Sequence, residues 1–164
     1  MLGEFSIATG LACGVTDDPA KAGIYILFTD ELGDISGEEK WLKFNGVGSE
    51  WYFRKVERNV INSKYNPFVS LASGYDDHIT IAVIALERSP RWRSKLAFGM
   101  AVAFGMAGTS QDYETVTGLP ARHEHLQNID TFLLKFMYAH LKPKMLWKDA
   151  LVLIDEFITS GVKQ

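Results

Sequence analysis

Cysteine is almost absent from this sequence, which has a single one, Cys13, among 164 residues. A disulfide needs two cysteines, so none forms within the chain, and we expect a reducing compartment and a cytoplasmic location. Long apolar runs are also lacking, since no stretch reaches the about 18 to 20 residues that a membrane-spanning helix requires. The sequence therefore predicts no membrane span.

An excess of basic residues is missing as well. Lysine and arginine number 17 against 20 aspartates and glutamates, which gives a net charge of −3. Nucleic-acid-binding proteins usually have the opposite balance, so nucleic acid is not an expected partner. The chain also lacks a P-loop, a dinucleotide-binding glycine motif, a Cys-x-x-Cys pair and a Gly-x-Ser-x-Gly elbow. It therefore indicates no particular cofactor.

The apolar content, in contrast, is ample for one core. Apolar residues make up 47% of the chain, and no linker-like stretch divides it, which predicts a single domain over 1–164. Apolar runs bounded by turn residues predict buried strands over 23–30 and 78–87. The segment 40–46 is a further strand candidate, and 49–61 fits a helix and a strand equally well.

The word Ala-Phe-Gly-Met-Ala occurs twice between Leu96 and Gly108. In a helix this segment would show no apolar face, and Gly99 and Gly105 would each cost about 1 kcal/mol in the helix interior. In a strand it has large side chains on one face and only Ala or Gly on the other. We therefore predict a strand, with a helix as the alternative because Ala, Met and Leu favour helices.

The preceding strand supports this interpretation. If the chain turns at Pro90, one register places Ile81 opposite Phe98 and aligns large side chains with large ones and small with small. Such cross-strand neighbours stabilise a sheet. The pattern predicts a long central hairpin formed by about 78–87 and 91–106.

Two helices are predicted in the last third of the chain. Apolar residues fall at helical spacing over 124–141 and 145–159, with Leu133 and Ile154 among the expected core positions. The short connection between the two segments favours an antiparallel pair. The predicted fold is therefore α+β, an antiparallel sheet whose long hairpin is covered by the two C-terminal antiparallel helices.

Two histidine-containing clusters are candidates for chemistry. Asp76, Asp77 and His78 precede a strand, where carboxylates and an imidazole can hold a divalent metal or act as a catalytic acid and base. The same residues also fit an ordinary turn. His123 and His125 are candidate metal ligands, but within a helix two residues this close in sequence point in nearly opposite directions. The sequence accordingly predicts no metal site.

Candidate binding residues lie in two other segments. Asp30 and Asp34 follow the first predicted strand, where loops of α/β folds often contact ligands. Arg91, Trp92 and Arg93 belong to a basic cluster at the proposed hairpin turn, where an anion contact is conceivable. Both segments also fit ordinary solvated loops.

Three functions remain open on these grounds. The favoured one is a small non-catalytic interaction protein, of an immunity or inhibitor kind, that binds another protein or itself. The second is a metal-assisted hydrolase or transferase built from Asp76, Asp77 and His78 together with the region of His123 and His125. The third is a small-ligand-binding domain with a pocket lined by Trp41, Trp51 and Phe98.

Overall fold

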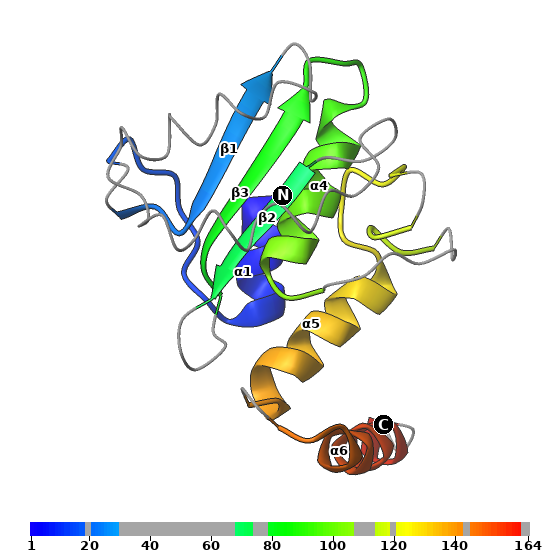
Figure 1. Ribbon diagram of the computed structural model, residues 1–164. Helices are drawn as coiled ribbons and strands as arrows, with labels where there is room; N and C mark the ends of the chain where they lie inside the picture. The colour runs from blue at the N-terminus through cyan, green and yellow to red at the C-terminus, as the bar shows by residue number, and fades with distance from the viewer. Residues whose placement is uncertain are drawn as a thin grey trace.

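The computed structural model describes seven segments of the chain, which are residues 1–18, 21–29, 68–73, 79–106, 114–118, 121–142 and 145–161. Four helices and three strands lie within them (Figure 1). In chain order these are α1 (Leu2–Thr9), β1 (Ile24–Thr29), β2 (Phe68–Ser73), β3 (Ile79–Glu87), α4 (Trp92–Ala103), α5 (Asn128–His140) and α6 (Trp147–Gly161). None of these helices is long and apolar enough to cross a membrane.

The three strands form one mixed sheet in the order β1-β3-β2. β1 runs parallel to β3, with Ile24 beside Ala82 and Thr29 beside Glu87, whereas β2 runs antiparallel to β3. The central strand is buried from Ala82 to Leu86, which explains its continuous apolar sequence. The strands predicted over 23–30 and 78–87 are confirmed.

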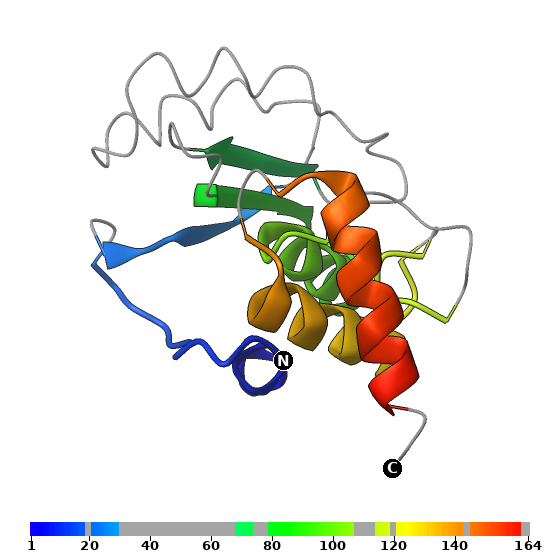
Figure 2. The same cartoon turned by 90° about the horizontal axis from the view of Figure 1, so that it is seen from below.

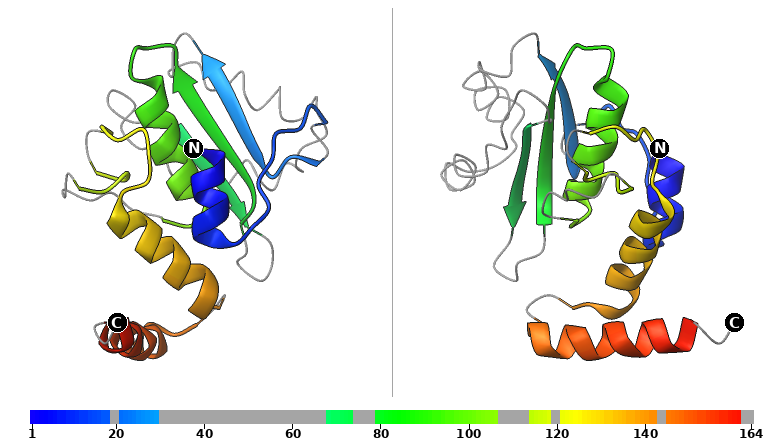
Figure 3. Two further views of the ribbon diagram at one scale, coloured as in Figure 1. Left: turned by 180° about the vertical axis from the view of Figure 1, so that it is seen from behind. Right: turned by 90° about the vertical axis from the view of Figure 1, so that its right-hand side faces the viewer.

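The hairpin predicted from 78–87 and 91–106 is wrong, and with it the antiparallel sheet. The second segment forms helix α4 over Trp92–Ala103, and the neighbours of β3 are β1 and β2. α4 lies against one face of the sheet, and α1 and α5 lie on the far side of α4 (Figure 3). Because its side chains are buried almost all around the axis, this helix needs no apolar face, and its sequence shows none.

The two glycines of the repeated word have separate roles in α4. Gly99 faces the sheet, where a Cβ atom would lie only 2.5 Å from Ile84 Cγ2. Gly105 follows the helix with φ +99°, a conformation that favours glycine. The N–H of Gly105 donates to Val102 O at 2.9 Å and that of Met106 to Ala101 O at 3.0 Å. This Schellman motif ends the helix, so only Gly99 is an interior glycine.

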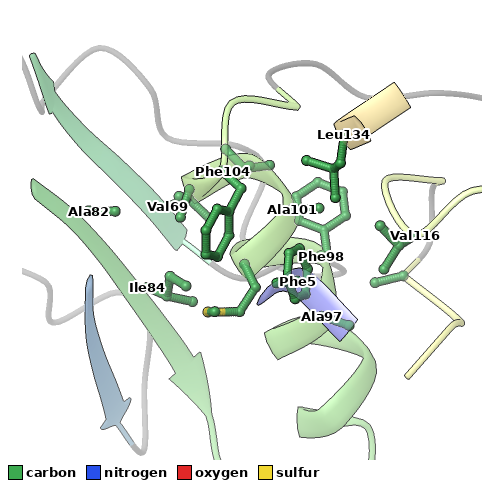
Figure 4. Packing of buried hydrophobic residues seen from close by; sticks show 14 of the residues in the cluster. Phe5, Val69, Ala82, Ile84, Ala97, Phe98, Ala101, Phe104, Val116 and Leu134 are labelled. Carbon is green, nitrogen blue, oxygen red and sulfur yellow. The ribbon is translucent and has the colours of Figure 1, made fainter. Parts of the chain in front are cut away.

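The core lies between the sheet and the three helices α1, α4 and α5 (Figure 4). Phe5 of α1 stacks on Phe104 at the end of α4, with ring centroids 5.0 Å apart. Leu134 of α5 and Val116 are fully buried in the same cluster. The N-terminal helix is therefore part of the core.

The two C-terminal helices are confirmed as helices, but they do not cover the sheet as predicted. α5 packs on α1, and α6 crosses α5 beyond the rest of the fold (Figure 2). Leu133, which the periodicity placed in the core, is 38% exposed, and its neighbour Leu134 is buried instead. Ile154 is half-buried. The covering element is α4, which the sequence analysis assigned to the sheet.

Candidate functional site

The carboxyl ends of β1 and β3 lie side by side because these two strands are parallel. At this edge the end of β1 lies beside the turn that leads from β3 into α4 (Figure 1), and the Phe28 ring contacts Trp92. The turn is closed by a hydrogen bond from Trp92 N to Ser89 O at 3.1 Å. The edge where two parallel strands end is a favoured position for ligand contacts in sheets of this kind.

An open depression of about 560 Å³ lies at this edge, lined by Phe28, Arg88, Ser89, Pro90 and Trp92. Its aromatic walls meet edge to face, with the ring centroids of Phe28 and Trp92 5.6 Å apart and the planes at 75°. Phe28 remains 45% exposed. The Ser89 hydroxyl is shielded from solvent and has no hydrogen-bond partner among the described residues. The depression thus has mainly aromatic walls, with a buried hydroxyl among its lining residues.

Positive charge gathers around the depression. The Arg93 guanidinium lies over the Trp92 ring, 5.4 Å from its centroid, and its Nη1 atom is 4.0 Å from Glu124 Oε2. Arg91 is the N-cap residue of α4, no side chain caps this end, and the first turn contains no acidic residue. Basic residues at a helix N-terminus oppose the helix dipole, so their positions cost some stability. Arg91 and Arg93 thus place two positive charges beside the depression on a chain of net charge −3.

Glu87, the last residue of β3, forms an ion pair with Lys95, whose side chain is almost completely buried. Lys95 Nζ lies 3.6 Å from Glu87 Oε2, and the Lys95 side chain is 9% exposed. This ion pair joins the last residue of β3 to the second turn of α4. It fixes the helix start relative to the sheet edge.

Of the candidate binding residues, the structure places Arg91, Trp92 and Arg93 together at this edge. The segments 40–46 and 49–61 lie outside the described residues. So do the other candidates, which are Asp30, Asp34, Trp41, Trp51, Asp76, Asp77 and His78.

His125, one of the two candidate histidines before α5, forms a structural link to α1. His125 Nδ1 donates to Glu4 Oε1 at 2.6 Å, and Leu126 N donates to Glu4 Oε2 at 3.3 Å. Burial raises the pKa of the Glu4 carboxyl, but the hydrogen bonds from His125 and Leu126 outweigh it, so the pKa lies below its ordinary value of 4.5. The described segments include His123, but nowhere in them do three or more His, Cys, Asp or Glu side chains lie together in a group that could hold a metal ion.

Phe28 is the site residue that the sequence analysis missed. Its position beside Trp92 depends on the parallel pairing of β1 with β3. The available signal was its place near the end of a buried apolar run, where a parallel strand exposes its last residues to ligands.

Comparisons with protein-family models, curated proteins and solved structures found no match to this chain.

Proposed function

We propose that this protein is a protein-binding module that receives an acidic peptide segment of its partner in the depression between Phe28 and Trp92. The observation that carries the proposal is the exposed aromatic pair with Arg93 stacked on it. An aromatic or large aliphatic side chain of the partner fills the depression, and flanking carboxylates pair with the arginines.

The residue types favour a protein partner. Trp and Arg are enriched among the residues that dominate binding energy at protein interfaces. The Trp92 ring is held between Phe28 and Arg93, so little side-chain entropy remains to be lost on binding. A volume of about 560 Å³ accommodates one or two large side chains.

The charges favour an acidic segment. Arg91 has no ion pair with the described residues, and the contact of Arg93 with Glu124 is long at 4.0 Å and exposed. A partner carboxylate can replace that contact at small cost, because exposed ion pairs contribute about 1 kcal/mol or less. Nucleic acid is the less favoured ligand, because Glu87 and Glu124 lie at the same edge and the net charge is −3.

Selection from a displayed library of random peptides tests the proposal. We expect enriched peptides with an aromatic or leucine anchor flanked by Asp and Glu. Trp92→Ala and Arg93→Glu should each weaken binding of these peptides at least tenfold, as truncation of an interface hot spot does. Lys135→Glu on the exposed face of α5 makes the same charge change as Arg93→Glu at a distant position and should leave binding unchanged.

Two results would overturn the proposal. One is a set of enriched peptides that bind Trp92→Ala as tightly as the native protein. The other is oligothymidylate binding that exceeds peptide binding and depends on the same arginines, which would indicate a nucleic-acid ligand.

A further inference from the structure

A second surface lies at the opposite end of the molecule from the depression (Figure 1). Thirteen large apolar side chains are exposed among the described residues, and eight of them lie between positions 129 and 158. This region contains α5, α6 and their connection. Such a concentration of exposed apolar area is characteristic of an interaction surface.

Helix α6 is covered by α5 along one side. Phe157 contacts a stripe of three α5 rings, with centroid distances of 5.1 Å to Phe132, 5.2 Å to Phe136 and 5.3 Å to His140. Ala150, one heptad before Phe157, is 6% exposed. The side of α6 that carries these two residues is therefore occupied within the chain.

The adjacent side of the same helix is apolar and open. Leu151 is 43% exposed and Ile158 is 50% exposed. Because positions seven apart on a helix differ by only about 20° in direction, these two residues share one side. With the half-buried Ile154 between them they form a strip, called here the α6 seam (Leu151, Ile154, Ile158).

Two opposite charges border the α6 seam. Lys148 and Asp155 are also seven residues apart, so they lie on one flank, next to Leu151 and Ile158. Both are exposed, and neither has an ion pair with the described residues. Their order along the helix, lysine first and aspartate second, makes this flank complementary to itself when two copies run antiparallel.

We propose that the α6 seam is a homodimer interface in which two copies of α6 pack antiparallel about a two-fold axis. The axis passes between Leu151 and Val152, so that Leu151 of each copy packs on Leu151 and Ile154 of the other, and Ile158 lies just beyond the start of the other copy's helix. Lys148 of each copy then meets Asp155 of the other, which gives two identical ion pairs. A parallel arrangement would instead place the two Lys148–Asp155 flanks on opposite sides of the helix pair, so these residues would not meet.

The surrounding surface enlarges this interface. A stable dimer usually buries about 800 Å² per partner, more than a single helical seam provides. The exposed residues Ile129, Phe132 and Leu133 extend the apolar area onto α5, joined to α6 through the Phe132–Phe157 contact. The right-hand view of Figure 3 shows α6 projecting clear of the sheet, where a second copy can reach it.

Sedimentation of the full chain with exchanged charges tests the proposal. We expect the native protein to pass from monomer to dimer between about 1 and 100 µM, the range of a modest interface. Lys148→Glu and Asp155→Lys should each weaken self-association at least tenfold, because each variant carries like charges at both pairing positions. An equimolar mixture of the two variants should form dimers again. In the mixed dimer one ion pair is native, between Lys148 and Asp155, and the other has its two charges exchanged.

Recovery in the mixture shows that both variants are folded and that the pairing is antiparallel. Three results would overturn the proposal. These are a native protein that stays monomeric over the whole range, single variants that dimerise as well as the native protein, and a mixture that stays monomeric. The first would leave the α6 seam to a different partner or to none.

Discussion

The Asp130 carboxylate accepts a hydrogen bond from the backbone N–H of Val116 at 2.9 Å, joining two positions 14 residues apart. The same oxygen, Oδ2, accepts a second hydrogen bond from Gln127 N at 2.8 Å, at the start of α5. Asp130 is completely buried. A single side chain therefore accepts a hydrogen bond from the backbone at the start of α5 and holds the 114–118 segment against that helix.

Replacement of Asp130 by alanine should lower the free energy of unfolding by about 2 to 4 kcal/mol. The reason is that the buried N–H of Val116 and the partly buried N–H of Gln127 lose their acceptor at once. Urea unfolding measures the loss, and the exposed Asp17→Ala is the matched control with no expected effect. A loss below about 0.5 kcal/mol for Asp130→Ala would show that the carboxylate does not support this junction.

Gly99→Ala should destabilise the protein by about 1 to 3 kcal/mol, because the new methyl group would overlap Ile84 Cγ2 between α4 and β3. Gly3→Ala is the control, since a Cβ there meets nothing within 4 Å. Its expected effect is a small gain, as for other Gly to Ala changes in helices.

The pair Gly99→Ala and Ile84→Ala should be strongly non-additive. Removal of the Ile84 side chain makes room for the new methyl group, so the double variant should be more stable than the sum of the single losses predicts. Additive losses in urea unfolding would place the clash elsewhere.

The Glu4–His125 link should make stability depend on pH. A carboxyl whose pKa is lowered on folding contributes stability above its ordinary value of 4.5, and this contribution is lost as the pH falls through the lowered pKa. The native protein should therefore lose more stability than Glu4→Gln between pH 5 and pH 3. The difference should be below about 1 kcal/mol because Glu4 is 36% exposed. Parallel pH profiles of the melting temperature in the two proteins would contradict the link.

Phe157→Ala should release α6 from α5 and leave the rest of the fold nearly as stable. The Phe157 ring contacts three rings of α5, so its loss removes most of the side-chain packing at this junction. Hydrogen exchange of the α6 amides should become at least tenfold faster, with a much smaller change in the exchange of β3. Val152→Ala, at a side chain 56% exposed, is the control. Equal acceleration in α6 and β3 would show that the helix unfolds only with the core.

The sequence predicted the type of element well where apolar residues form a short continuous run or recur at helical spacing. The apolar runs of β1 and β3 and the periodic spacing in α5 and α6 each identified the correct element. It failed at α4, because a helix enclosed on all sides has no apolar face and its large and small residues can alternate by chance. The candidate site was half predicted: Arg91, Trp92 and Arg93 are adjacent in sequence, whereas the contribution of Phe28 depends on long-range strand pairing that no local pattern encodes.

The strand order β1-β3-β2 has a consequence for folding of the chain during its synthesis on the ribosome. In the described sheet, both earlier strands pair with β3 and not with each other. Neither has its hydrogen-bonding partner until the chain has been made through Glu87, and the helix that covers the sheet follows immediately. During synthesis the apolar strand β1 must therefore wait through more than fifty residues without its partner. During that period β1 is an apolar strand without its long-range partner, the condition in which nascent chains are most exposed to wrong pairings.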